Sequence, residues 1–223
     1  MAASGQRDTK GYDVLGREWP VLLSLIIVAV LCAILIGRIV HVPRISPAGS
    51  RDVVLVTGGV LAVAILVVSL LNRLRAARTF QVVFASLATI FLLEAVSELV
   101  SSLPKLRTSG EGLILLRDAA IVFAIDIILF SVWFWMIDAA GADGTSKRRD
   151  FLFVQEVMNI PGWEKWRPDF SFYIFMSFYN SVTFGPTDTY VLSRRGRFLI
   201  VLQVIISLVV VLTFLARAFV IIK

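Results

Sequence analysis

Long apolar runs dominate the chain and determine its fold class. Five of them follow one another, at about residues 20–39, 53–71, 80–103, 114–137 and 198–222. A helix of about 20 apolar residues crosses the hydrocarbon core of a bilayer, and 58% of all residues are hydrophobic. The sequence therefore predicts an all-α, multi-pass integral protein of the cell membrane with about five transmembrane helices.

The rest of the composition excludes several classes of function. The formal net charge of +6 comes from basic residues in short clusters between the apolar runs, which is where membrane topology places them, so no nucleic acid partner is expected. Cys32 is the only cysteine and His41 the only histidine, which leaves no intrachain disulfide and too few ligands for a zinc site. Without a catalytic or cofactor motif, we expect no enzyme, no cofactor and no metal site, and the lipid bilayer as a partner.

One stretch, residues 169–188, fits neither a span nor an ordinary loop. Its helical part, about residues 170–185, is aromatic almost all round and rich in hydroxyl groups, and it is shorter than the roughly 17–25 residues that a spanning helix needs. Irregular backbone at membrane depth is tolerated only where protein buries it or where it lines a wet cavity. The stretch therefore predicts a short re-entrant pore helix and loop, over residues 169–192, between the last two spans.

The spacing of residues in and after this stretch carries a family resemblance. The positions concerned are Ser177, Phe178, Thr183, Gly185, Asp188 and the run Gly196-Arg197-Phe198-Leu199. They resemble the pore-loop cation channel superfamily, the potassium channels and their bacterial relatives. In that superfamily a Ser-Phe pore helix precedes the filter Val-Gly-Tyr-Gly-Asp and an inner helix with a Gly-Arg-Leu-like start. The resemblance covers roughly residues 114–223, and the loop is also similar to that of bacterial membrane families with a Pro-Thr-Asp-Thr version.

This resemblance implies a homotetramer in a bacterial inner membrane that passes monovalent cations, K⁺ or Na⁺, through a filter-like pathway. The residues at the filter positions are Thr183, Phe184, Gly185, Pro186, Thr187 and Asp188. Pro186 stands where the family has tyrosine, and Thr187 where it has the second glycine. Since Pro186 fixes φ and Thr187 has a branched Cβ, the outer half of a potassium filter cannot form here. The selectivity for potassium is therefore expected to be altered.

The predicted organisation has three parts. They are a polar N-terminal segment (1–18), a three-helix peripheral membrane region (19–113) and a pore-like module (114–223). The module consists of an outer helix (114–138), a linker with a short interfacial helix at about 151–160 (139–168), the re-entrant helix and loop (169–192) and an inner helix (197–222).

Charged residues inside the spans are further candidates for function. They are Glu94, Glu98, Asp126 and Arg217. Glu94 and Glu98 share one helix face because they are four residues apart. A charge at membrane depth is costly, so such a residue usually faces the bundle interior and has a partner or a task. Two interpretations stay open: internal pairing, with Arg217 as the basic partner, and a pathway for cations or protons.

The sequence thus predicts a channel-like membrane protein with passive permeation of monovalent cations. The alternatives are a non-conducting membrane scaffold or sensor derived from a channel module, and a small proton-coupled carrier that uses intramembrane carboxylates. With five spans, the connectors on the side of the N-terminus hold 14 Lys and Arg residues against 7 on the other side. The positive-inside rule then places the N-terminus in the cytoplasm, and the re-entrant loop enters from the cytoplasmic side, opposite to potassium channels.

Overall fold

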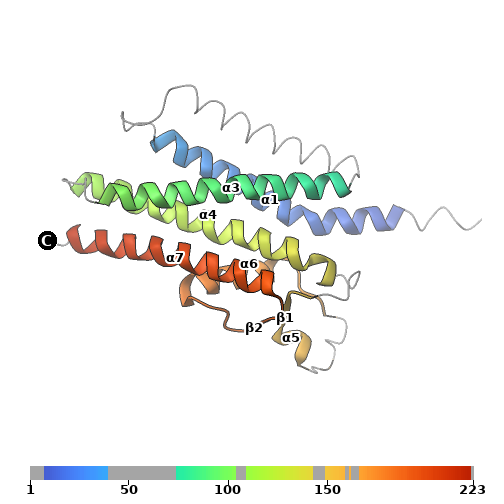
Figure 1. Cartoon of the computed structure of the whole chain (residues 1–223). Helices are drawn as coiled ribbons and strands as arrows, with labels where there is room; N and C mark the ends of the chain where they lie inside the picture. The colour runs from blue at the N-terminus through green and yellow to red at the C-terminus, as the bar shows by residue number, and fades with distance from the viewer. Residues whose placement is uncertain are drawn as a thin grey trace, which may run out of the picture. The chain divides into compact units, whose positions relative to one another are not determined.

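The structure, a computed structural model, describes residues 8–39, 74–103, 109–142, 149–158, 161 and 166–221. The second predicted span, at about residues 53–71, lies outside these ranges. The chain divides into two compact units, Met1–Ala88 and Thr89–Lys223, and each is described by itself. The described residues are mostly helical (Figure 1), which confirms the predicted helical class.

The first unit contains helix α1, Asp8–Ile39. The helix begins inside the predicted polar N-terminal segment, and its apolar part, Trp19–Leu35, begins where the first span was predicted to open. Pro20 lies within the helix, where proline has no backbone N–H to donate. The buried residues of α1 recur at helical spacing, at Val21, Leu25 and Val28, as expected of a helix with one buried face.

In the described part of the chain, three helices are long and apolar enough to cross a membrane. The apolar segments are Gln81–Ser102, Leu113–Asp138 and Arg194–Ala216, in helices α3 (Leu74–Ser102), α4 (Ser109–Ala142) and α7 (Arg194–Ile221). They correspond to the third, fourth and last predicted spans, and they support a membrane protein.

Helix α7 begins three residues earlier than predicted because Ser193 caps it. The Ser193 hydroxyl accepts the N–H of Gly196 at 3.0 Å, and its carbonyl oxygen accepts the N–H of Arg197 at 3.1 Å. A serine that accepts the third N–H of a helix is a common N-cap. This cap places the basic start of α7 inside the helix.

Helices α4, α6 (Phe170–Thr183) and α7 pack against one another and form the core of the second unit (Figure 1). The start of α6 agrees with the predicted one, since the Asp169 carboxylate accepts the N–H of Ser171 at 2.9 Å and caps the helix. The helix ends at Phe184, which has a left-handed backbone with φ 59°. Among the described residues, Phe184 is the one non-glycine residue with positive φ.

The second unit also contains a small antiparallel sheet of two strands. Strand β1 is Phe151–Phe153 and strand β2 is Thr189–Val191. Phe151 lies opposite Val191, and Phe153 lies opposite Thr189. The sheet therefore joins the connector after α4 to the segment after α6.

The predicted interfacial helix at 151–160 is corrected by this sheet. Residues 151–153 form β1, and the only helix that the structure describes in this range is the single turn α5, Val154–Val157. Phe151 and Phe153 are buried and Leu152 between them is half-buried, which is the two-residue alternation of a strand. The prediction of an all-α fold is therefore right for the helices and misses the two short strands.

The chain reverses its direction around α6. Near the start of α6, Tyr173 contacts Asp138 at the end of the α4 apolar segment. Two helical turns later, Ser181 contacts Asp126, near the middle of that segment. The chain then returns through β2, which pairs with β1 close to Asp138. In Figure 1, α6 lies largely behind α7, and the β2 segment runs below α7 toward β1.

Candidate functional site

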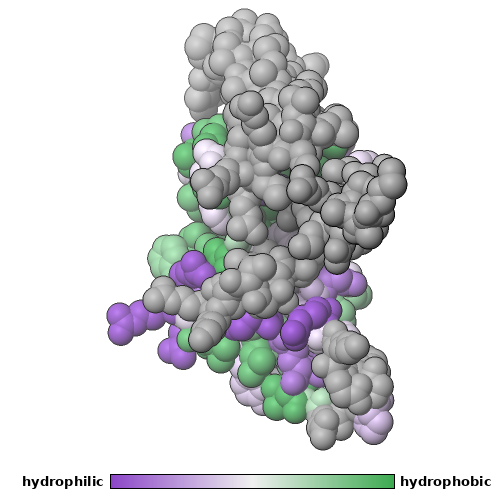
Figure 2. Space-filling view, turned by 90° about the vertical axis from the view of Figure 1, so that its right-hand side faces the viewer, coloured by the Kyte–Doolittle hydropathy of each residue, from purple (hydrophilic) through white to green (hydrophobic). Residues whose placement is uncertain are grey.

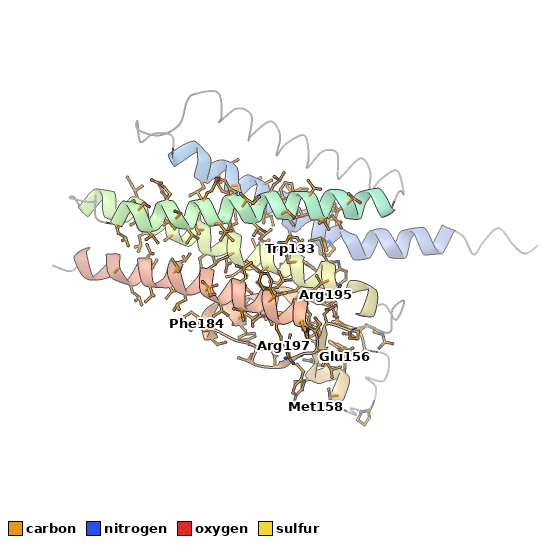
Figure 3. All side chains as sticks on the ribbon, viewed as in Figure 1. Trp133, Glu156, Met158, Phe184, Arg195 and Arg197 are labelled. Carbon is orange, nitrogen blue, oxygen red and sulfur yellow. The ribbon has the colours of Figure 1, made fainter. Side chains whose placement is uncertain are left out.

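The six residues Thr183–Asp188, here called the filter-like loop, begin two residues after Ser181, at the last residue of α6, and thus lie near the middle of the α4 apolar segment. All of them are exposed except Gly185, which is half-buried. The Thr183 hydroxyl lies 2.8 Å from the Tyr179 carbonyl oxygen and 2.9 Å from the Gly185 carbonyl oxygen. Figure 3 shows Phe184 beside the middle of α7, well away from Arg195 at the start of that helix. The loop therefore presents hydroxyl and carbonyl oxygens beside the middle of the α4 apolar segment.

A buried polar cluster lies behind the loop, where α4, α6 and α7 meet. We call it the Asp126 cluster; its members are Asp126, Ser177, Asn180, Ser181, Gln203 and Ser207, all fully buried. The carboxylate atom Asp126 Oδ2 accepts hydrogen bonds from the hydroxyls of Ser181 at 3.1 Å and Ser207 at 2.6 Å. Asp126 therefore links all three helices through one oxygen atom.

The amide of Gln203 holds α7 against α6 within this cluster. Its Nε2 atom donates to the Ser177 carbonyl oxygen at 3.0 Å, to the Ser177 hydroxyl at 2.7 Å and to the Ser181 hydroxyl at 2.9 Å. The Ser177 hydroxyl in turn donates to the Ile127 carbonyl oxygen of α4 at 2.6 Å. A buried network of this kind fixes one arrangement of the helices, because every alternative leaves polar groups unpaired in apolar surroundings.

Four buried side-chain atoms of the described residues have no hydrogen-bond partner, and all of them belong to this cluster. They are Asp126 Oδ1, Asn180 Oδ1, Asn180 Nδ2 and Gln203 Oε1. An unpaired buried polar group costs about 1–3 kcal/mol, and more when it is charged. Both hydrogen bonds that Asp126 Oδ2 accepts come from serine hydroxyls and not from a Lys or Arg side chain.

A second polar group lies where α6 and α7 begin and α4 ends. We call it the Asp138 network; its members are Asp138, Arg149, Asp150, Glu156, Tyr173 and Arg195. The buried Asp138 carboxylate accepts the backbone N–H groups of Asp150 at 2.7 Å and Phe151 at 3.2 Å. It also accepts the Tyr173 hydroxyl at 2.6 Å. Asp138 therefore joins α4, β1 and α6.

Two arginines complete this network. Arg149 pairs with Glu156 at 2.6 Å and with Asp138 at 3.4 Å. Burial lowers the pKa of Arg149, but the hydrogen bond and the charge of Glu156, together with Asp138, hold this pKa above its ordinary value. Arg195 binds both carboxylate oxygens of the buried Asp150, at 2.6 and 2.5 Å.

The labelled side chains of Arg195 and Glu156 lie near each other in Figure 3, at the end of α7 that is close to the sheet. Figure 2 looks onto this end, where hydrophilic residues gather beside exposed apolar ones. The Asp138 network thus holds the sheet close to the starts of α6 and α7.

Aromatic rings fill the space around Tyr173. The ring centroids of Trp135 and Phe153 each lie 5.4 Å from that of Tyr173, in edge-to-face geometry. Phe170 packs against Trp135 at 5.9 Å in the same way. Such aromatic pairs stabilise by about 0.5–1.5 kcal/mol beyond the area that they bury. They hold the first turn of α6 against α4.

The three predicted intramembrane carboxylates differ in burial. Asp126 is buried as predicted, but Glu94 and Glu98 lie on an exposed face of α3. The side chain of Arg217 lies outside the described residues, so its predicted pairing with a carboxylate stays a prediction. In the part of the chain that the structure describes, no group of three His, Cys, Asp or Glu residues is arranged to hold a metal ion.

Sequence reasoning missed most partners of Asp126 and the role of Asp138. Serines in a span are usually helix-packing hydroxyls, and an Asp at the end of a span marks the membrane interface. One signal was present: Ser177 and Ser181 are four residues apart, as are Gln203 and Ser207. Polar residues at this spacing form a polar stripe on an otherwise apolar helix, and here the two stripes face each other.

Comparison of the chain with protein-family models, with curated proteins and with solved structures found no match.

Proposed function

We propose that the chain is one subunit of a channel-like protein of the bacterial inner membrane that allows passive permeation of monovalent cations. In this proposal five helices cross the membrane, and α6 with the filter-like loop is a re-entrant segment. The reversal around α6 carries the proposal. From Tyr173, which contacts Asp138, the chain runs along α4 to Ser181, which contacts Asp126, and then returns to the sheet. This path agrees with the order of outer helix, pore helix, loop and inner helix in pore-loop channels.

The charges around the loop support cations as the permeating species. Residues 169–193 contain Asp169 and Asp188 but no Lys or Arg. The filter-like loop also follows the C-terminal end of α6, which carries the partial negative charge of the helix dipole. Because Thr183 and Thr187 add hydroxyl oxygens, the loop attracts a cation and repels an anion.

The surroundings of the loop support an oligomer. Its irregular, exposed backbone lies at the depth of Asp126, and such backbone needs water or protein around it in a membrane. The neighbouring face of α6 is also exposed and aromatic, at Phe175, Phe178 and Tyr179. A homotetramer provides both environments, with a water-filled axis beside the loop and a second subunit against the aromatic face.

We propose that this pathway discriminates weakly between K⁺ and Na⁺. Potassium filters replace the hydration shell of the ion by stacked carbonyl oxygens. Pro186 and Thr187 prevent that stack in the outer half of the loop. Thr183, Gly185 and Asp188 leave one or two sites of hydroxyl, carbonyl and carboxylate oxygen.

The test is cation flux into liposomes that contain the purified full-length protein. A Cβ at Gly185 has no atom within 4 Å, so Gly185→Ala leaves the fold of one subunit intact. We expect this variant to lower the flux severalfold, because the added methyl group narrows the pathway. Asp188→Asn lowers the flux as well, since it removes the charge. Glu94→Gln is the matched control, because it neutralises an exposed carboxylate outside the loop and leaves the flux unchanged.

The other outcomes are equally informative. A stable oligomer that passes no cation contradicts the channel and favours the non-conducting scaffold. Flux that requires a pH gradient and is lost in the double variant Glu94→Gln, Glu98→Gln favours the carrier. The geometry gives the carrier no support, because Glu94 and Glu98 are exposed whereas Asp126 is buried.

A further inference from the structure

One face of helix α7 is exposed and begins with two arginines. We call it the α7 stripe; its members are Arg194, Arg197, Phe198, Val201, Ile205 and Leu208, all exposed. Residues that recur at three and four positions lie on one side of a helix. The other side of α7, with Ile200, Gln203 and Ser207, is buried. The stripe is therefore one continuous surface with a basic end and an apolar remainder.

The two arginines of the stripe have no carboxylate partner. In the part of the chain that the structure describes, neither Arg194 nor Arg197 forms an ion pair. The carboxylates of the Asp138 network are already bonded to other arginines, Asp150 to Arg195, and Asp138 and Glu156 to Arg149. Because Arg194 and Arg197 are three residues apart on a helix, their Cβ atoms lie about 5–6 Å from each other. Two guanidinium groups this close can bind one phosphate group, which arginine recognises through paired hydrogen bonds.

The position and the length of the stripe fit a phospholipid. Arg194 is the first residue of the apolar segment Arg194–Ala216, and basic side chains at the end of such a segment reach the headgroup level of a membrane. From Phe198 to Leu208 the stripe is about 15 Å long, which is half the thickness of a hydrocarbon core of about 30 Å. Phe198 and Val201, next to the arginines, are 67% and 56% exposed. The arginines thus match the headgroup, and the apolar part matches an acyl chain in one leaflet.

The charge of the arginine pair discriminates between possible occupants of the stripe. A second copy placed symmetrically on this face would bring two pairs of like charges together, which opposes association. A cation pathway along the stripe would begin at two positive charges, which repel the ion. A zwitterionic lipid carries an ammonium group beside its phosphate and gains less from the arginines than an anionic lipid. An anionic phospholipid fits both ends of the stripe.

We propose that the α7 stripe binds one anionic phospholipid, with the lipid phosphate on Arg194 and Arg197 and an acyl chain along the apolar part of the stripe. The lipid neutralises the arginine pair and covers the exposed apolar surface that follows it. Because the site exists only when α7 is helical, the lipid binds the folded protein and stabilises it. The stripe shares no residue with the aromatic face of α6 that the channel proposal assigns to a second subunit.

The test is the unfolding temperature of the full-length protein in a non-ionic detergent, with added phosphatidylglycerol or with phosphatidylcholine of the same acyl chains. We expect phosphatidylglycerol to raise the unfolding temperature by about 5 °C when it is near 100 times its dissociation constant, and phosphatidylcholine to raise it much less. The double variant Arg194→Gln, Arg197→Gln abolishes this difference. Both side chains are exposed and form no described ion pair, so without lipid the double variant should unfold at the wild-type temperature.

Arg167→Gln is the matched control for Arg197→Gln. Arg167 is also exposed, but it precedes α6 and lies outside the stripe. The control should keep the effect of phosphatidylglycerol, whereas Arg197→Gln should lose most of it. Equal losses in these two single variants would show a general attraction to negative lipid surfaces and would overturn the site.

Two further outcomes would also overturn the proposal. Equal effects of the two lipids on the wild type would mean that the arginine pair recognises no anionic headgroup, and a second copy on the stripe would give this result. An equal rise in inorganic phosphate at the same concentration would mean that a free anion, and not a lipid, binds the arginines. The assay does not depend on ion flux, so its result is independent of the channel proposal.

Discussion

The hydrogen bond between Tyr173 and Asp138 gives the sharpest test of how α6 is held. Tyr173→Phe removes the hydroxyl that donates to the buried Asp138 carboxylate at 2.6 Å and leaves the ring against Trp135 and Phe153. A hydrogen bond to a charged group contributes about 1.5–3 kcal/mol. Asp138 keeps its two backbone donors and Arg149, so we expect the lower part of this range, about 2 kcal/mol.

Thermal unfolding of the full-length protein in detergent measures this loss. For a chain of this size, about 1 kcal/mol corresponds to about 2–4 °C, so Tyr173→Phe should unfold about 4–8 °C below the wild type. Tyr190→Phe is the matched control. It removes the same hydroxyl from an exposed residue of β2 and is expected to change the unfolding temperature by no more than about 2 °C.

A double-mutant cycle that combines Tyr173→Phe with Asp138→Asn tests whether the two side chains interact. If the Tyr173 hydroxyl acts through the Asp138 charge, its removal costs much less once that charge is absent. Additive losses in the double variant would refute the reasoning. Equal effects of Tyr173→Phe and Tyr190→Phe would refute it as well.

Two further predictions use the same thermal assay. Phe184→Gly should raise the unfolding temperature by about 2–4 °C, because glycine adopts the left-handed backbone at φ 59° without the cost of about 1 kcal/mol that a Cβ adds; a lower temperature would show that the Phe184 ring makes a needed contact. Gly196→Ala should destabilise by about 1–3 kcal/mol, since its Cβ would lie 3.2 Å from two ring atoms of Phe151. Gly185→Ala, where nothing is near, should leave the temperature unchanged, and equal effects of the two glycine variants would contradict this argument.

The helices of the second unit could be predicted from the sequence, but most of their ends and the sheet could not. A run of about 20 apolar residues is a strong signal that depends on composition alone. The start of α6 was also predictable, because Pro168-Asp169 carries its own cap. The sheet was not, because strands of three residues give almost no periodic signal, and Phe151–Phe153 obtains its partner from a distant part of the chain.

The candidate site could likewise be predicted from the sequence only in part. The filter-like loop is contiguous, so its spacing could be recognised in the sequence. The burial of Asp126 followed from its place inside a span. The partners of Asp126 could not be derived, because Ser181 and Ser207 lie on other helices and each alone resembles a packing hydroxyl. Only the helix register, which places both serines on Asp126 Oδ2, gives them a role.

Two contacts of one kind help to hold α6 in place, each between a hydroxyl of α6 and a buried carboxylate of α4. Tyr173 bonds Asp138 near the start of α6, and Ser181 bonds Asp126 near its end. Both carboxylates belong to the same helix, so α4 sets the position of α6 along it and hence the place of Thr183, the last residue of α6. A single chain therefore fixes where the filter-like loop lies. The loop residues are mostly exposed, so we expect substitutions in α4 to act on stability and, under the proposed channel function, substitutions in the loop to act on ion flux.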